Sequence, residues 1–172
     1  MNDTFLPGNG FDTYEEQDRI LMGLSGSVRS GVAVRILQQQ GFAVAAAVVR
    51  LADTPEEHAA AEAAKALAKK LDVECLALNA EALAGQDAEA ARFAALLTAA
   101  DKLGIQYVAS GHYARMETDT QGVSHLFPPE SGAPDESNRL AALSPEVLAR
   151  LILPLGDFAP EDVEDMAEDF KL

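Results

Sequence analysis

Two short segments of the chain combine serine and glycine with a charged or titratable side chain, which suits the binding of an anion. Residues 25–30 have the sequence Ser-Gly-Ser-Val-Arg-Ser, and residues 110–113 have the sequence Ser-Gly-His-Tyr. A short Ser/Gly turn that leads into a helix presents unpaired backbone N–H groups, which bind phosphate. The same residue types also cap helices, so capping and binding both stay open. The candidate binding residues are Ser25, Gly26, Ser27, Arg29, Ser30, Gly111 and His112.

The elements around these segments alternate between strands and helices. Apolar runs predict strands at 19–24, 42–49, 73–78 and 105–110, and helical spacing with capping residues predicts helices at 28–40, 53–71 and 87–103. The continuous apolar run at 42–49 is typical of a strand that is covered on both faces. The alternation predicts an α/β fold, a Rossmann-like doubly wound parallel sheet with right-handed crossovers. Ligands of such folds bind at the carboxyl ends of the strands, where the strand order switches, and both Ser/Gly segments follow a strand.

The remaining parts of the chain have weaker patterns. Residues 1–18 are expected to form a flexible arm, and residues 19–172 a single α/β domain. Residues 113–172 of that domain are expected to hold a hairpin, a loop and a small C-terminal helical appendage. We place the hairpin at 114–127, the loop at 128–138, one helix from 144 to about 151 and another from 160.

The composition argues against several kinds of site. The 172 residues include 13 Lys and Arg against 28 Asp and Glu, a formal charge of −15. Basic residues are scattered, which disfavours autonomous nucleic-acid binding. One cysteine excludes a disulfide framework, and three histidines without ligand spacing predict no bound metal. The apolar run at 43–49 is far shorter than the roughly 20 residues of a membrane span, and residues 1–18 lack the basic residues of a leader, so we expect a soluble cytoplasmic protein.

Acidic residues gather near the two ends of the chain, at 3–18 and at 157–169. They form either a solvated surface or a docking face for a basic protein partner. Alanine-rich helices and a sheet edge would also permit a homodimer.

The residues of the first turn and of three later motifs carry a resemblance. Residues 20–33, Ile-Leu-Met-Gly-Leu-Ser-Gly-Ser-Val-Arg-Ser-Gly-Val-Ala, resemble the PP-loop of the ATP-pyrophosphatase (adenine nucleotide alpha hydrolase-like) superfamily, whose motif is Ser-Gly-Gly-x-Asp-Ser. More narrowly, the chain is similar to the N-terminal domain of the bacterial tRNA-specific 2-thiouridylase family. The matches are Val-Ala-Ser-Gly-His-Tyr-Ala-Arg at 108–115, Asp-Glu-Ser at 135–137 where the family has Asp-Gln-Ser, and Leu-Pro-Leu-Gly-Asp at 153–157.

This resemblance implies a nucleotide-binding domain related to enzymes that adenylate a tRNA wobble uridine and then insert sulfur. Its cofactor would be ATP or AMP, or a phosphate or sulfate anion in their place. Gly111 and His112 would lie beside the nucleotide, although a histidine at a strand end can also be an ordinary hydrogen-bonded residue.

The turn departs from the family motif at two positions. Ser27 stands where the family has its second glycine, and Arg29 where it has an aspartate that lies beside the magnesium pyrophosphate. Arginine in the first turn of a helix opposes the helix dipole by about 0.3–1 kcal/mol, which a bound phosphate would offset. Arg29 therefore indicates either metal-free anion binding or a decayed pocket with the arginine in solvent. Reverting Arg29→Asp with Ser27→Gly is expected to restore magnesium–ATP affinity if only the turn has changed.

The sulfur chemistry of the family has no counterpart among these residues. Aligning Ala-Arg-Phe at 91–93 with the family's Ile-Lys-Phe puts Asp87 at the position of the catalytic cysteine. The one thiol, Cys75, lies in a strand pattern and is expected to be a small buried hydrophobe. The chain also ends near Leu172, ahead of the family's second cysteine and tRNA-binding domains.

Three functions remain open from the sequence. The first is a degenerate relative that binds a nucleotide or phosphate anion without thiolating tRNA. The second is an active ATP-dependent adenylating enzyme that works with a partner in tRNA modification. The third is an acidic protein-interaction module with an empty pocket.

Overall fold

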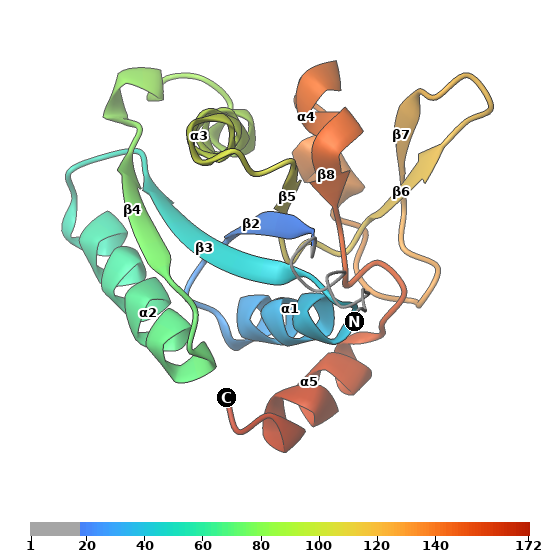
Figure 1. The fold of residues 1–172 in the computed structure, drawn as a ribbon, viewed down its shortest axis with the longest axis horizontal. Coiled ribbons are helices and arrows are strands. Elements are labelled where there is room, and N and C mark those ends of the chain that lie inside the picture. The colour runs from blue at the N-terminus through green and yellow to red at the C-terminus, as the bar shows by residue number, and fades with distance from the viewer. Residues whose placement is uncertain (1–17) are drawn as a thin grey trace, which may run out of the picture.

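The computed structural model describes residues 18–172, so the arm predicted for residues 1–18 lies outside the described part apart from Asp18. Its centre is a five-stranded parallel sheet with the order β4-β3-β2-β5-β8 (Figure 1). Four of the strands follow the predicted positions closely: β2 (Arg19–Gly23), β3 (Ala43–Arg50), β4 (Cys75–Asn79) and β5 (Tyr107–Ala109). The α/β class and the parallel, doubly wound sheet are thereby confirmed.

Helices cover both faces of this sheet. Helix α1 (Val28–Gln39) and helix α2 (Pro55–Leu71) lie on one face, and helix α3 (Ala88–Leu103) lies on the other (Figure 1). Side chains of β2 alternate between the two cores, since Ile20 and Met22 pack with α1 and α2 while Leu21 packs with α3. This is the period-two pattern of a strand that is buried on both faces.

Capping residues begin and end these helices where the sequence places them. Thr54 is the N-cap of α2 and accepts a hydrogen bond from the Glu57 N–H at 3.2 Å, and Pro55 occupies the first turn. Asp87 caps α3 in the same way through the Ala90 N–H at 3.0 Å. A cap oxygen satisfies a backbone donor that the helix itself cannot satisfy.

The strand order switches between β2 and β5. The chain adds β3 and β4 on one side of β2 and then returns to place β5 on the other side. Met22 pairs with Ala109 in the register of β2 and β5, so the residues that follow these strands leave the sheet side by side. The fold thus brings segments 25–30 and 110–113 together at the carboxyl edge, as expected for a switch point.

The C-terminal third of the chain contains the predicted hairpin and one strand that the sequence did not predict. The hairpin pairs β6 (Arg115–Thr118) with β7 (Ser124–Phe127). Helix α4 (Pro145–Arg150) ends just before Leu151, and β8 (Leu151–Ile152) then pairs with β5 as the fifth strand of the sheet. Our prediction of helix to about residue 151 missed β8, because two residues are too few to show a strand period.

Three short or terminal elements complete the described part. Single 3₁₀ turns occur at η3 (Glu81–Leu83) and η4 (Ser137–Leu140). Helix α5 (Pro160–Asp169) lies beside α1 (Figure 1), where Val163 and Ala167 are buried in the same core while its acidic residues are exposed. Within residues 18–172, no helix has the length and apolar character needed to cross a bilayer.

Candidate functional site

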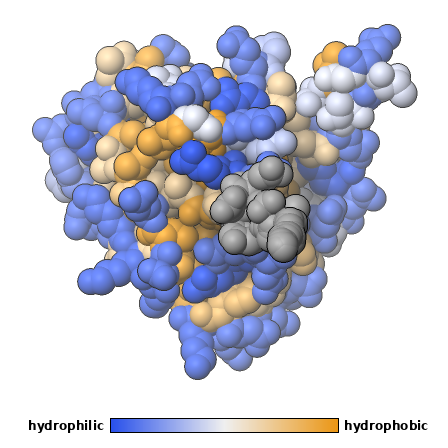
Figure 2. Space-filling model, in the orientation of Figure 1, coloured by the Kyte–Doolittle hydropathy of each residue, from blue (hydrophilic) through white to orange (hydrophobic). Residues whose placement is uncertain are grey.

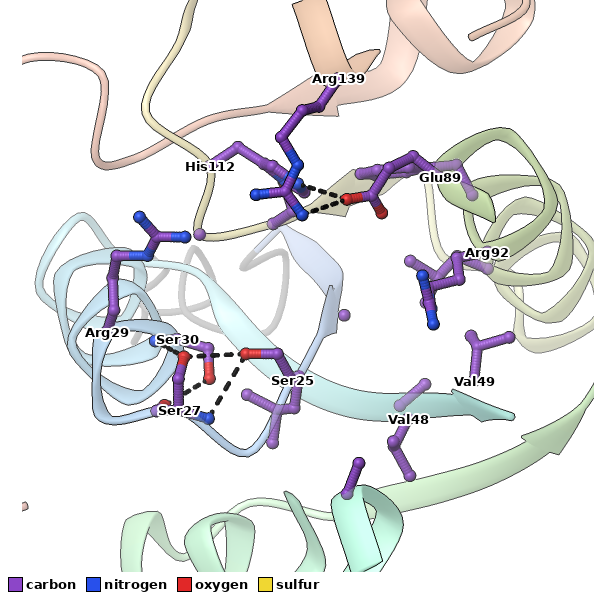
Figure 3. Close-up of a pocket in the computed structure, with 18 of the residues that line it drawn as sticks. Ser25, Ser27, Arg29, Ser30, Val48, Val49, Glu89, Arg92, His112 and Arg139 are labelled. Carbon is purple, nitrogen blue, oxygen red and sulfur yellow. Dashed lines mark hydrogen bonds and ion pairs between the residues drawn. The ribbon is translucent and has the colours of Figure 1, made fainter. Parts of the chain in front are cut away.

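A pocket of about 310 Å³ opens at the carboxyl edge of the sheet, where β2 and β5 end. Six of the seven candidate residues line it: Ser25, Ser27, Arg29, Ser30, Gly111 and His112. In Figure 3 the serine turn lies on one side of the pocket, Arg92, Val48 and Val49 lie on another, and His112, Glu89 and Arg139 lie above. The two Ser/Gly segments, whose nearest ends are 80 positions apart in sequence, therefore form one site.

Hydrogen bonds among the serines of the turn fix the start of α1. Ser27 is the N-cap, and its Oγ accepts from the Ser30 N–H at 3.4 Å. The Oγ atoms of Ser25 and Ser27 are 2.8 Å apart, and the Ser30 hydroxyl donates to the Ser27 carbonyl at 2.7 Å. The capping role of these residues is thus present in the structure. The turn also lines the pocket, so α1 begins at the pocket wall. The first N–H groups of a helix have no acceptor inside the helix, and such groups can bind an anion.

Gly26, the seventh candidate, shapes the turn from outside the pocket lining. Its φ of +84° is a left-handed conformation that favours glycine. A Cβ atom there would lie 2.9 Å from the Ala63 Cβ and 3.3 Å from the Ala60 carbonyl oxygen. The turn therefore packs directly against α2, and glycine allows that approach.

Arg29 lies at the edge of the pocket and is held by an acidic partner. Both Nη atoms of Arg29 lie 3.3 Å from Oε2 of Glu136, and the guanidinium carbon lies 4.6 Å from the centre of the Tyr113 ring. Oε1 of Glu136 accepts the Tyr113 N–H at 2.8 Å. The interpretation in which Arg29 points into solvent is therefore wrong, because the ion pair and the ring contact bind its guanidinium.

A second set of charged groups continues around the pocket from His112. Its Nδ1 lies 2.7 Å from the Ser110 Oγ, and its Nε2 lies 2.9 Å from Oε2 of Glu89 on α3. The same carboxylate oxygen accepts from Arg139 at 3.0 Å, and Arg139 also reaches Glu136 at 3.3 Å. His112 is therefore hydrogen-bonded on both ring nitrogens and also lines the pocket, and its place beside a nucleotide stays a prediction.

The environment of Glu89 shifts its pKa downward. Burial alone would raise the pKa of this carboxyl group, but the hydrogen bond from His112 and the positive charges of His112, Arg139 and Arg92 outweigh burial. Glu89 is thus held as a carboxylate at the pocket wall.

Removing the Glu89 carboxylate is expected to lower stability at neutral pH and to matter less in acid. Because its pKa is lower folded than unfolded, its contribution is complete above the unfolded pKa of about 4.3 and disappears as the pH falls through the folded pKa. For Glu89→Gln we expect the free energy of unfolding at pH 7 to fall by about 1–3 kcal/mol. Urea unfolding at several pH values measures this.

The matched control is Glu74→Gln, which alters an exposed carboxyl group at the start of β4, away from the pocket. It should leave the unfolding free energy nearly unchanged. A deficit in Glu89→Gln that stays constant down to about pH 3 would contradict the assignment.

Four charged pocket residues were missed at the sequence level: Glu57, Glu89, Arg92 and Arg139. Glu89 and Arg92 are three residues apart on α3, so helical spacing could have placed them on one face. Arg139 lies two residues after the Asp-Glu-Ser segment at 135–137, within η4. Its local sequence does not indicate that Arg139 lies near the serine turn, because only the folding of the chain brings η4 to the pocket.

Much of the remaining wall is apolar. Leu24, Val48, Val49, Phe93 and Leu96 contribute side chains to it, from the ends of β2 and β3 and from α3. Figure 2 shows hydrophobic side chains gathered on this face between α2 and α3, with hydrophilic residues around them. An apolar wall beside a few convergent polar groups is the usual composition of a small-molecule site.

The residues present do not fit a magnesium site at the serine turn. Magnesium prefers carboxylate oxygens, and residues 25–30 include none. Glu57 and Glu89, which line the pocket, and Glu136, which pairs with two of its arginines, are each within 4 Å of an arginine or histidine nitrogen. Among residues 18–172, no three His, Cys, Asp or Glu side chains are grouped so as to hold a metal ion.

Cys75 is less buried than the sequence predicts. It lies at the start of β4, an edge strand, and its side chain is partly exposed while it packs against the core of α1 and α2. Partial burial raises the pKa of its thiol. It does not line the pocket, so the one thiol of the chain is remote from the candidate site.

Comparisons with known proteins find a matching family model and similar relatives. The family model described as "tRNA methyl transferase HUP domain" matches residues 87–172, half of the chain. The chain is 32% identical over 184 residues to "tRNA-specific 2-thiouridylase MnmA" from Yersinia pestis (strain Pestoides F) and to that from Yersinia pseudotuberculosis (strain YPIII). These alignments cover 91% of this chain and 49% of each relative, so the chain spans about half the length of the curated relatives it matches.

Solved structures share the fold at low sequence identity. The U34-tRNA thiolase NcsA from Methanococcus maripaludis superposes with a TM-score of 0.62 at 15% identity, covering 90% of this chain and 57% of that one. The glutamine-dependent NAD+ synthetase from Acinetobacter baumannii superposes with a TM-score of 0.56 at 16% identity, covering 92% of this chain and 30% of that one. Both comparisons bear on the arrangement of strands and helices.

Proposed function

The chain belongs to the family of the tRNA methyl transferase HUP domain, and from this membership we propose that its pocket binds a nucleotide or phosphate anion without thiolating tRNA. The observation that carries the proposal is the pocket of about 310 Å³ at the switch between β2 and β5. Its two sides match the two parts of a nucleotide. The apolar side formed by Val48, Val49 and Leu96 suits a base, and the serine turn at the start of α1 suits a phosphate.

Sulfur transfer is left out of this proposal because no thiol of the chain lies at the pocket. The family's cysteine position is occupied by Asp87, whose carboxylate caps α3. Cys75 is in β4 and has a raised thiol pKa, whereas sulfur transfer needs an accessible thiolate.

An active adenylating enzyme that works with a partner is the second candidate. The 32% identity to proteins named as tRNA-specific 2-thiouridylases favours it. Arg29 and the absence of carboxylates in residues 25–30 oppose it, because magnesium would have to be held by the nucleotide alone.

An acidic partner-binding face is the third candidate and is compatible with either of the others. Exposed acids on and before α5 support it: Asp157, Glu161, Asp162, Glu164, Asp165, Glu168 and Asp169. Such a face would attract a basic protein and repel nucleic acid, so binding of RNA by this chain alone is not proposed. A homodimer stays a prediction.

Calorimetric titration with ATP, AMP and pyrophosphate, each with and without magnesium, tests the proposal. We expect at least one of these ligands to bind without magnesium. The variant His112→Ala should weaken that binding by about tenfold, which corresponds to the loss of one charge-assisted contact. His125→Ala is the matched control, because His125 is an exposed histidine in β7.

The other outcomes separate the candidates. Release of pyrophosphate from ATP would establish the enzyme instead. Absence of binding by every ligand would leave the acidic interaction module and refute the proposal.

A further inference from the structure

We propose that Glu136 determines the phosphate specificity of the pocket, and that the pocket takes nucleoside monophosphates in preference to nucleoside triphosphates or pyrophosphate. This inference rests on the proposed function, since it assumes that the pocket binds a nucleotide. It is carried by the ion pairs of Glu136, by the balance of charges around the pocket and by the donor set of the serine turn.

Glu136 binds two of the three arginines at the pocket. Its Oε2 lies 3.3 Å from both Nη atoms of Arg29 and 3.3 Å from Nη1 of Arg139. Its Oε1 accepts the Tyr113 N–H, and the Tyr113 carbonyl accepts the Glu136 N–H at 3.1 Å. The side chain of Glu136 is only 13% exposed, so these contacts are partly shielded from water. Both guanidiniums are therefore committed to a resident carboxylate.

The charges around the pocket cancel. The arginines are Arg29, Arg92 and Arg139, and the carboxylates that pair with them are Glu57, Glu89 and Glu136. Arg92 is the most loosely held of the three, at 3.7 Å from Glu57. A polyanion entering this pocket would meet no surplus positive charge, and the chain as a whole carries −15.

A single phosphate group fits what the serine turn offers. The Ser30 hydroxyl donates to the Ser27 carbonyl, which leaves one hydroxyl of the Ser25–Ser27 pair and the first two N–H groups of α1 as neutral donors. This small set suits one phosphate with its about two negative charges at pH 7. Each further phosphate adds charge that would need a free cation or a magnesium ion. Glu136 pairs with Arg29 and Arg139, and residues 25–30 have no carboxylate for magnesium.

The variant Glu136→Gln tests this directly. Glutamine keeps an oxygen that can accept the Tyr113 N–H but removes the charge that holds Arg29 and Arg139. Titrations without magnesium, in EDTA, should show wild-type protein binding AMP at least about tenfold more tightly than ATP or pyrophosphate. In Glu136→Gln we expect ATP and pyrophosphate affinities to rise by about tenfold and AMP affinity to change by less than about threefold.

Two further variants make the test decisive. Glu74→Gln has the same change of charge at the far end of the sheet and should leave all three affinities as in wild type. Arg29→Gln should weaken pyrophosphate binding below that of wild type, because it removes one of the two positive charges that neutralise Glu136. This variant tests the inference if circular dichroism shows that Glu136→Gln does not fold.

Wild-type protein that binds ATP or pyrophosphate as tightly as AMP would overturn this inference and leave the proposed function standing. So would a folded Glu136→Gln variant with an unchanged order of affinities. Wild-type protein that binds none of the three ligands would overturn both proposals.

Discussion

The double variant Ser27→Gly with Arg29→Asp is expected to bind magnesium–ATP as weakly as wild type, and adding Glu136→Gln is expected to raise that affinity by about tenfold or more. The double variant restores the family turn but removes the guanidinium that pairs with Glu136, whose Oε2 lies 3.3 Å from Arg29, and adds a negative charge to the same turn. Glu136 then lacks this partner, and its charge opposes the binding of a polyphosphate and repels the new carboxylate. Glutamine at position 136 removes that repulsion, so the new carboxylate can face a cation.

Calorimetric titration of both variants with magnesium–ATP measures the difference. A matched triple variant that carries Glu74→Gln in place of Glu136→Gln has the same formal charge and controls for it. Equal affinities of the double variant and the Glu136→Gln triple variant would show that Glu136 does not oppose the restored turn.

Gly26→Ala is expected to be the most destabilising single substitution among the site residues, with a loss of about 2–5 kcal/mol. Alanine is strained at a φ of +84°, and its Cβ would lie 2.9 Å from the Ala63 Cβ and 3.3 Å from a backbone oxygen of α2. Either the turn or α2 would have to move. Urea unfolding followed by circular dichroism gives the free energy of unfolding.

Gly122→Ala is the matched control for this substitution. Gly122 has nearly the same φ, +83°, but nothing lies within 4 Å of the position of a new Cβ. Its variant should lose only the conformational part, about 1–2 kcal/mol. Similar losses at the two positions would show that packing of the turn on α2 contributes little.

The order of strands and helices could be predicted from the sequence because each element is specified locally. The apolar run before Arg50, the cap at Thr54 and the glycine at position 104 mark β3, α2 and the end of α3 within a few residues. The switch-point position of the two Ser/Gly segments followed from that order. In contrast, the edge position of β4 depends on sheet topology, which is why Cys75 is more exposed than its apolar neighbours indicate.

The charge network of the site could not be predicted for a related reason. Arg29 and Glu136 are 107 residues apart in the sequence, and each alone is compatible with a solvent-exposed side chain. Their contact depends on how the segment after the hairpin crosses the start of α1. An arginine beside a phosphate-binding turn favours anion binding in the sequence, but a carboxylate that pairs with it in the fold weakens that inference.

The strand β8 limits where segments of two related chains can be joined into one protein. Because Leu151 and Ile152 extend the sheet beyond β5, the C-terminal third is built into the framework and is not a detachable module. The same third supplies Glu136 and Arg139 to the rim of the pocket. A chimera that takes its first two thirds from one relative and its last third from another would therefore inherit Arg29 and Glu89 from one parent and their partners Glu136 and Arg139 from the other. Crossovers between Tyr113 and Glu136 would separate partners that must match.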